Sequence, residues 1–188
     1  IAVVGVSSSP DGWANHMFLQ PLIDFQFPGP LYPINPHADT ICGLKAYKSL
    51  RDVPQPVDYV IVSIPAPLTP QVMADCAAQG VKAVSLYTAG FSDSGKPAGR
   101  ELEAKLLAIA RSAGVRIIGP NCVGIYCPDS QLSFNSQAPR EGGHLAFLSQ
   151  SGRYVQEFTA RGGRMGLRFS KVISYGNASD LNESDFMD

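Results

Sequence analysis

Five short segments of the chain carry small, polar or proline residues directly after apolar runs, and they are the first candidates for binding a ligand. They read Gly5-Val6-Ser7-Ser8-Ser9-Pro10, Asn35-Pro36, Ser63-Ile64-Pro65-Ala66-Pro67, Thr88-Ala89-Gly90-Phe91 and Gly119-Pro120-Asn121-Cys122. Residues of this kind let a ligand approach backbone amides closely, and such amides bind phosphate and other anions where a helix begins. One such segment would mean little, whereas five together predict a rim shaped for an extended, nucleotide-like ligand.

The first segment differs from the fingerprint of dinucleotide-binding proteins. Gly5 takes the place of the first glycine in G-x-G-x-x-G, but Ser7 and Pro10 replace the other two. Asn35 and His37 follow the second apolar run, where an NAD enzyme carries an acidic residue for the ribose hydroxyl. The missing carboxylate suits a ligand with a phosphorylated ribose, although a plain tight turn at Gly5 accounts for the same residues. Because Gly5 must turn the chain, we expect a valine there to abolish ligand binding and to leave the fold largely intact.

A second candidate site follows a later apolar run. Ser151 and Gly152 precede a helical pattern, and the free N–H groups at the start of a helix attract anions such as phosphate. Glu157 lies on the same helical pattern and is either a solvated carboxylate or a part of this site. Cys122 has no neighbouring His, Lys or Arg that would activate its thiol, so we expect it to pack beside the ligand and not to act as a nucleophile.

The five segments must be positioned by regular secondary structure. Short runs rich in Val and Ile alternate with helical patterns along most of the chain. Strands are expected at residues 1–6, 31–34, 57–64, 82–88 and 115–118. Helices are expected at residues 13–25, 69–79 and 97–113, with a helical turn at 46–50. The run VDYVIVSI at 57–64 is typical of a strand buried on both faces of a parallel sheet. The order predicts an α/β fold with a doubly wound parallel sheet, whose ligands bind at the carboxyl ends of the strands.

The pattern restarts after a polar stretch. We expect a first domain at residues 1–128, a linker at 129–143 and part of a second α/β domain at 144–188. Within the second part, strands are expected at 144–148 and 169–174, a helix at 152–161 and the start of another helix at Glu183. Because this part is small for a domain and both ends of the chain look cut, we interpret the sequence as a portion of a longer protein.

Composition excludes several classes of protein. The 188 residues contain 15 Lys and Arg against 16 Asp and Glu, so there is no basic excess for binding nucleic acid. No apolar run approaches the roughly 20 residues that span a bilayer, so no membrane partner is expected. The four cysteines form no CxxC pair and the three histidines lie far apart, so we expect no metal site and a reducing, cytoplasmic location.

At this point the motifs resemble a known family, the CoA-binding domain of succinyl-CoA synthetase α subunits and NDP-forming acyl-CoA synthetases. The segment Gly119–Ile125 is similar to the family signature GPNCxG. The loops at Ile64–Pro67 and Thr88–Phe91 are similar to its loops after the third and fourth strands. In the second part, Ser149–Gly152 and Ser174–Asn177 are similar to the family turns SxSG and SxGN. The five matches occur in the right order and cover nearly the whole chain.

The resemblance implies a Rossmann-like CoA-binding domain followed by the start of a flavodoxin-like domain. It implies that coenzyme A is bound by Gly5, Ser7, Ser8, Ser9, Asn35, Pro36, Ser63, Ile64, Pro65, Ala66, Thr88, Ala89, Gly90, Asn121 and Cys122. Ser151 and Gly152 would form a phosphate loop, and Glu157 would orient a phosphohistidine. Arg153 stands where many relatives have a small or apolar residue, which is a departure from the family pattern.

The resemblance also implies a reaction. Enzymes of this family convert an acyl-CoA, phosphate and a nucleoside diphosphate into an acid, CoA and a nucleoside triphosphate, through an acyl phosphate and a phosphohistidine. His16, His37 and His144 lack the glycine-rich context of that histidine, which is therefore expected outside this chain. ATP or ADP and Mg would be bound by an ATP-grasp domain or subunit, also outside the chain, and an oligomer is expected.

The residues alone leave two alternative functions open. The same fold serves in the family as a non-catalytic CoA sensor that regulates a fused or partner acyltransferase. An NAD(P)-dependent oxidoreductase is a weaker alternative, since the chain lacks both G-x-G-x-x-G and the acidic residue after the second strand. A comparison of CoA binding with NAD(P)H binding separates these classes.

Overall fold

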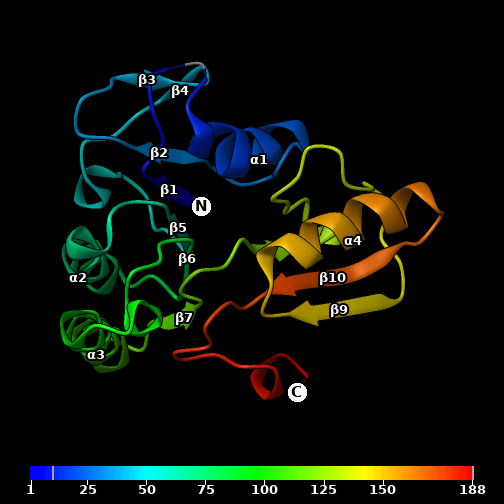
Figure 1. Ribbon diagram of the computed structural model, residues 1–188. Coiled ribbons are helices and arrows are strands. Elements are labelled where there is room, and N and C mark those ends of the chain that lie inside the picture. The colour runs from blue at the N-terminus through cyan, green and yellow to red at the C-terminus, as the bar shows by residue number, and fades with distance from the viewer. Residues whose placement is uncertain (10, 188) are drawn as a thin grey trace.

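The first part of the chain folds around a five-stranded parallel sheet. The computed structural model describes residues 1–9 and 11–187, so Pro10 and Asp188 of the sequence predictions lie outside the described residues. The strands are β1 (Ala2–Val4), β2 (Tyr32–Ile34), β5 (Tyr59–Val62), β6 (Ala83–Leu86) and β7 (Arg116–Ile118), in the order β2-β1-β5-β6-β7 (Figure 1). The strand order reverses between β1 and β5, so the expected doubly wound fold is confirmed.

Helices cover both faces of this sheet, and the alternation along the strands shows why. α2 (Thr69–Gln79) and α3 (Pro97–Ser112) pack on one face, together with Ala2 and Val4 of β1. The helical segment η1 (Asn15–Leu19) and α1 (Gln20–Asp24) cover the other face, where Val3 points. Because successive side chains of a strand point to opposite faces, a sheet buried on both sides needs the continuous apolar runs that the sequence contains.

The connection between β2 and β5 differs from the prediction. A helical turn was expected at 46–50, but the chain forms a hairpin of β3 (Thr40–Ile41) and β4 (Leu44–Lys45) and then the 3-10 turn Leu50–Asp52. Ser49 caps this turn by accepting a hydrogen bond from the Arg51 amide at 3.0 Å. This crossover therefore lacks the long helix of a regular βα unit.

The first helix also starts irregularly. Gln20 donates its N–H to the carbonyl of Asn15, five residues back, which is the wide turn of a π-helix. Pro21 follows and has no N–H, so it cannot make the regular bond to the residue four positions earlier. Among the described residues, no helix is both long enough and apolar enough to cross a membrane.

The second part forms a three-stranded sheet of β8 (Gly124–Tyr126), β10 (Phe169–Ser174) and β9 (Leu145–Ser149), covered by α4 (Gly152–Arg164). β9 and β10 are parallel, whereas β8 pairs antiparallel with β10. The sequence did not predict β8, which lies before the stretch expected as a linker. Phe134 and Ala138 of that stretch are buried beside Tyr126, and Phe25 of the first part packs edge-to-face on Tyr126. The core of the second sheet is thus completed by the first part.

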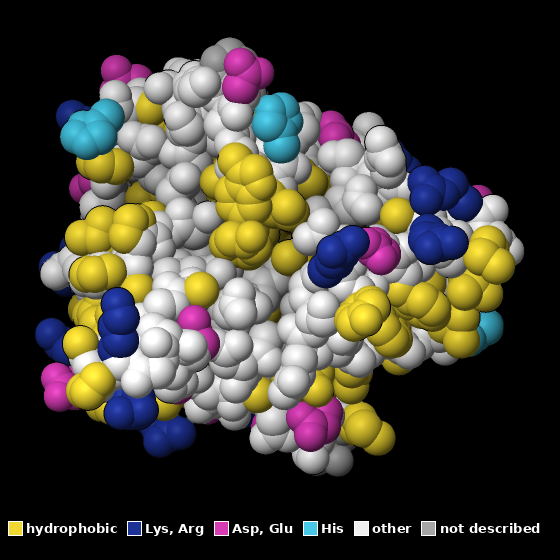
Figure 2. Space-filling view, in the orientation of Figure 1, with side chains coloured by type: hydrophobic (Ala, Val, Ile, Leu, Met, Phe, Trp, Pro, Cys, Tyr) yellow, Lys and Arg dark blue, Asp and Glu magenta, His cyan; other side chains and the backbone are white. Residues whose placement is uncertain are grey.

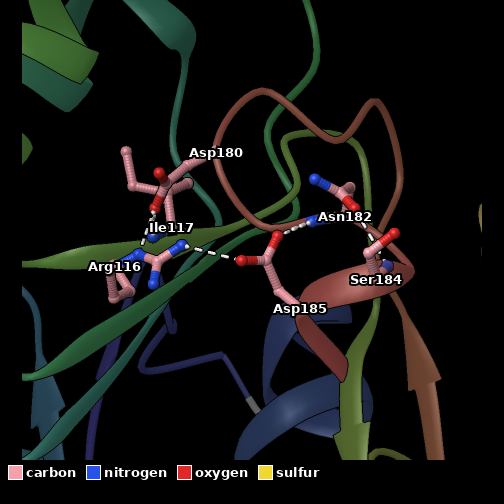
Figure 3. A network of polar contacts seen from close by, with 6 residues as sticks. All are labelled: Arg116, Ile117, Asp180, Asn182, Ser184 and Asp185. Atoms are coloured by element: carbon pink, nitrogen blue, oxygen red, sulfur yellow. Dashed lines mark hydrogen bonds and ion pairs between the residues drawn. The ribbon is translucent and has the colours of Figure 1, made fainter. Parts of the chain in front are cut away.

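The chain after β10 returns to the edge of the first sheet (Figure 3). Asp180 accepts hydrogen bonds from the Ile117 amide at 2.8 Å and from Arg116 Nε at 3.0 Å. Leu181 donates its N–H to the Ile117 carbonyl at 3.2 Å, as a neighbouring strand would. Asp185 lies 3.5 Å from the Arg116 guanidinium. Hydrogen bonds from the Asn182 amide, and then from Arg116, lower the pKa of the Asp185 carboxyl. The returning segment therefore covers the open edge of β7.

Candidate functional site

Three adjoining pockets run along the carboxyl ends of the parallel strands, and together they form what we call the strand-end groove. The first, of about 490 Å³, is lined in part by Gly5, Ser7, Asn35, Pro36 and Ile64. The middle pocket, of about 380 Å³, is lined by Ser63, Ile64, Pro65, Tyr87, Thr88, Ala89 and Asn121. The far pocket, also of about 380 Å³, is lined by Tyr87, Asn121, Cys122, Val123, Gln150, Ser151, Gly152, Arg153 and Gln156. Ile64 lines both the first and the middle pocket, and Tyr87 and Asn121 line both the middle and the far pocket, so each pocket adjoins the next.

The loop after β1 is held in shape by Asn15, which no sequence pattern indicated as a site residue. Asn15, only 2 % exposed, accepts a hydrogen bond from the Ser7 amide at 2.8 Å. Its amide nitrogen donates to the carbonyls of Ser7 at 2.7 Å and Ser9 at 3.1 Å. Ser9 in turn donates its N–H to Ser7 Oγ. The amides of Ser7 and Ser9 therefore serve the loop itself, and Asn15 fixes the shape that a ligand meets.

Gly5 sits where this loop leaves the strand. Its φ of +100° is a conformation that other residues rarely adopt. A side chain at Gly5 would also meet the backbone carbonyl of Ser63 at the end of β5. The packing of two neighbouring strands thus requires the glycine as much as the turn does, so a valine is expected to destabilise the fold as well as the loop.

Two predicted site residues tie strand ends together. Asn35 donates from Nδ2 to the Val6 carbonyl at 2.6 Å, and its Oδ1 accepts from the His37 amide at 2.8 Å. Thr88 donates from Oγ1 to the Ile64 carbonyl at 2.8 Å. These side chains shape the floor of the groove, because each one links the end of its strand to the end of the next strand in the sheet.

The first pocket contains polar residues that no local pattern indicated. Lys48 and Ser49 come from the irregular connection after β4, and Gln71 and Asp75 come from one face of α2. Asp75 is buried and accepts hydrogen bonds from Arg51 Nε at 2.6 Å and from Gln71 Nε2 at 3.0 Å. Lys48 is therefore the cation of this pocket whose charge no described ion pair engages.

The two glycine- and asparagine-containing signatures of the chain lie against each other. Asn177 donates its N–H to the Pro120 carbonyl at 2.9 Å, and Ser179 donates to the Gly119 carbonyl at 3.0 Å. A side chain at Gly176 would meet the Pro120 carbonyl. The segments 119–122 and 174–177, recognised separately in the sequence, are thus one junction between the two parts of the chain.

The start of α4 closes the far end of the groove. Ser151 caps the helix by accepting a hydrogen bond from the Tyr154 amide at 3.3 Å. Gly152 approaches Val123 so closely that an added methyl group would lie 3.1 Å from its side chain. The structure therefore brings Ser151 and Gly152 together with Asn121 and Cys122 in one pocket, although the sequence placed them in two separate candidate sites.

Glu157 does not line any of the three pockets of the groove. Its side chain is 48 % exposed and accepts a hydrogen bond from Arg153 Nε at 2.9 Å, one helical turn away. In the described part of the chain, Glu157 lines two surface hollows beside α4. Arg153 lines one of these hollows and also the far pocket of the groove. The departure noted at Arg153 thus places a cation at the groove and pairs it with Glu157. In Figure 2 a basic and an acidic side chain lie together over α4, beside the apolar centre of this face.

Cys122 is a packing residue. It is 2 % exposed, and its thiol donates to the Ile118 carbonyl at 3.3 Å. Burial raises the pKa of the Cys122 thiol to about 12, so the thiol is neutral at pH 7. No group of three or more His, Cys, Asp and Glu in residues 1–9 and 11–187 lies close enough to hold a metal ion.

Because two cysteine thiols are buried, we expect the free energy of unfolding to fall in alkali. The pKa values of Cys76 and Cys122 rise from 9.0 to about 12, both chiefly by burial. Above pH 9 the unfolded chain releases these protons and the folded chain keeps them, so the free energy of unfolding falls as pH rises. Each thiol should contribute a loss of about 1.4 kcal/mol by pH 10. Urea unfolding at pH 8, 9 and 10 measures this slope, and Cys122→Ala should reduce it; an unchanged slope in that variant would contradict the assignment.

A doubly wound parallel sheet with pockets at its strand ends is the architecture of nucleotide-binding α/β domains, and here it is joined to a second α/β unit. Residues 1–128 match the family described as "CoA binding domain". Residues 142–188 match the "Succinyl-CoA ligase like flavodoxin domain". The chain belongs to the CoA-binding domain family, and the resemblance to NDP-forming acyl-CoA synthetases is confirmed.

Individual relatives agree with this assignment. The chain is 37 % identical to the ADP-forming acetate–CoA ligase of Methanocaldococcus jannaschii, over all of this chain and 26 % of the relative. It is 38 % identical to the α subunit of ADP-forming acetate–CoA ligase II of Pyrococcus furiosus, over all of this chain and 40 % of that subunit. The chain therefore spans between a quarter and two fifths of these curated relatives.

A solved structure supports the fold over the whole length. The dinucleotide forming acetyl-coenzyme A synthetase 1 of Ca. Korarchaeum cryptofilum, in complex with phosphate and ADP, superposes with a TM-score of 0.89 at 34 % identity. The match covers 99 % of this chain and 40 % of that one. The two α/β parts of the chain thus follow the architecture of an acyl-CoA synthetase.

Proposed function

We propose that this chain is the CoA-binding portion of an ADP-forming acid–CoA ligase. The observation that carries the proposal is the strand-end groove, whose three adjoining pockets gather residues from all five predicted segments of the part that matches the CoA-binding family. The complete enzyme would convert acyl-CoA, ADP and phosphate into acid, CoA and ATP through an acyl phosphate and a phosphohistidine.

The groove suggests how CoA lies in it. The adenosine end fits the first pocket, where Leu68 and Val72 supply apolar surface and Lys48 supplies a cation for the ribose phosphate. The diphosphate passes residues 5–9. The pantetheine arm then crosses the middle pocket beside Thr88 and Ala89 toward the far pocket at Ser151. A long, flexible ligand with charge at one end suits a groove of this shape.

The remaining machinery of this proposal comes from outside the chain. His16, His37 and His144 are all exposed, and none of them lines the groove in the described residues, so the phosphohistidine is supplied elsewhere. Ser151 and Gly152 would hold its phosphate, and Glu157 would orient the imidazole. An ATP-grasp domain or subunit would bind ADP or ATP with Mg, in an oligomeric enzyme. The four cysteines of this chain are free thiols, and free thiols are typical of proteins in the reducing cytoplasm.

Calorimetric titration of the chain with CoA tests the proposal. We expect saturable binding at micromolar to millimolar CoA and none with NADH or NADPH, because the loop after β1 lacks the second and third glycines of a dinucleotide site. Lys48→Ala should weaken CoA binding about tenfold through loss of a charge-assisted bond. Lys82→Ala, which removes an exposed lysine paired with Asp58 outside the groove, is the matched control. A folded chain that produces no heat at millimolar CoA would sink the proposal.

A further inference from the structure

An exposed aromatic cluster stands beside the strand-end groove. Trp13, the single tryptophan of the chain, is 49 % exposed. Its ring lies 4.7 Å from the ring of Tyr87 and 5.8 Å from that of Phe18. Phe18 is fully buried in the core below. The cluster is therefore anchored on one side, while much of the Trp13 ring system remains open to solvent.

The position of Tyr87 connects this cluster with the groove. Tyr87 lines both the middle and the far pocket, where it is joined by Asn121. From the other side, Gln156 of the far pocket lies 3.8 Å from the sulfur of Met17, which belongs to the helical segment that begins at Trp13. Figure 2 shows an apolar cluster at the centre of this face, between the first part of the molecule and α4. Tyr87 thus borders the far half of the groove, and Trp13 packs against the ring of Tyr87.

The chemistry of the far pocket restricts what it can accept. Its polar side chains are largely neutral, with Asn121, Gln150 and Gln156 among them. The one charged residue that lines it, Arg153, is engaged by Glu157. A second carboxylate on the ligand would find no uncommitted cation among the described residues lining this pocket. A flat, apolar group would instead cover the exposed ring of Trp13, and aromatic rings pair well in offset or tilted arrangements.

We infer that Trp13 and Tyr87 form the wall that contacts the acyl end of the bound thioester, and that this wall favours flat, apolar acyl groups over acetyl and over dicarboxylic acyl groups. The inference rests on the proposed function, because the direction of CoA along the groove puts the thioester in the far pocket. Acetyl is too small to cover the Trp13 ring, whereas an aryl group gains the area and the ring contact.

Calorimetry with benzoyl-CoA, acetyl-CoA and succinyl-CoA tests the inference on the 188-residue chain. Benzoyl-CoA should bind about fivefold more tightly than acetyl-CoA, the size expected for an aromatic pair. Trp13→Ala should bring that ratio close to one with little change for acetyl-CoA, and Trp13→Phe should restore most of it. Tyr154→Ala removes an exposed aromatic that lies outside the groove, and it should leave the ratio unchanged.

Trp13 also reports directly, since it is the only tryptophan and its emission comes from one position. Benzoyl-CoA should change this emission more than CoA does at saturation, and Tyr87→Phe should keep the change because it keeps the ring. If all three thioesters bind and Trp13→Ala leaves their ratios unaltered, the acyl end lies elsewhere and the inference is overturned. If no thioester binds to the folded chain, the proposed function falls and the inference with it.

Discussion

Replacing Gly5 by valine is expected to remove CoA binding and to lower the free energy of unfolding in the same variant. The φ of +100° at Gly5 is strained for any other residue, and a Cβ would press on the backbone carbonyl of Ser63 and on the side chain of Ile64. Backbone strain and overpacking together should cost about 3 kcal/mol. Relief of the clash must move either the loop after β1 or the end of β5, and both border the first pocket. We therefore expect CoA affinity to fall more than ~100-fold.

Gly43→Ala provides the matched control. Gly43 also has a positive φ, of +78°, but nothing lies within 4 Å of an added side chain in its hairpin. This variant carries the strain without the clash, and it should lose about 1 kcal/mol of stability and keep CoA affinity. Denaturant unfolding and calorimetry measure both quantities on both variants. CoA affinity within threefold of the wild type in Gly5→Val would show that the loop after β1 is not part of the binding site.

The strands and helices that position the site could be predicted from the sequence, because the apolar patterns that specify them are local. Val3 faces one layer of helices and its neighbours Ala2 and Val4 face the other, so a strand covered on both sides must be apolar throughout. Once such strands alternate with helices, right-handed crossovers bring their carboxyl ends to one edge of the sheet. The residues after each strand are then neighbours in space, which is why the predicted segments line one groove.

The contacts that shape the groove depend on tertiary packing and leave no local signal. Asn15 resembles any polar residue on an amphipathic helix until the chain folds the loop of Ser7 onto it. Tyr87 belongs to an apolar run, and nothing in that run indicates that two pockets share its ring. Lys48 follows a hairpin where a helical turn was expected. β8 was missed because it has only three residues and begins with a glycine, which gives no strand pattern.

The second sheet shows the same division between local and tertiary signals. The turns at 149–152 and 174–177 were recognisable as motifs, but their meeting with residues 119–122 depends on the path of the chain after β10. Asp180 completes that path by accepting a hydrogen bond from the Ile117 amide at 2.8 Å. Ser179 adds a hydrogen bond to Glu103 of α3 at 2.7 Å. The junction of residues 119–122 with 174–177 is therefore stabilised by hydrogen bonds from the chain after β10 to both β7 and α3.

The proposed function predicts a large difference in phosphate labelling between the 188-residue chain and the full-length ligase. The 188-residue chain should take up no acid-labile phosphate from ATP or acetyl phosphate, because His16, His37 and His144 are exposed and lie outside the groove lining that the structure describes. A phosphohistidine carries about two negative charges and needs donors for its oxygens. The start of α4 offers such donors at Ser151 and Gly152, but none of the three histidines lines that pocket.

The full-length ligase proposed above should be labelled on histidine, and Glu157 tests whether α4 belongs to that site. In the free chain Glu157 is engaged by Arg153, so orienting an imidazole requires the carboxylate to leave Arg153 and to accept a hydrogen bond from the ring N–H. Glu157→Ala in the full-length protein should lower the phosphate yield about tenfold if the carboxylate orients the ring. Glu141→Ala is the matched control, because Glu141 pairs with Arg168 at 2.8 Å in the same part of the chain. Incorporation of radiolabelled phosphate, with acid and base lability to identify histidine, gives the result. Labelling of the 188-residue chain on histidine would contradict the placement of the phosphohistidine elsewhere, and equal labelling of Glu157→Ala and Glu141→Ala would remove Glu157 from the site.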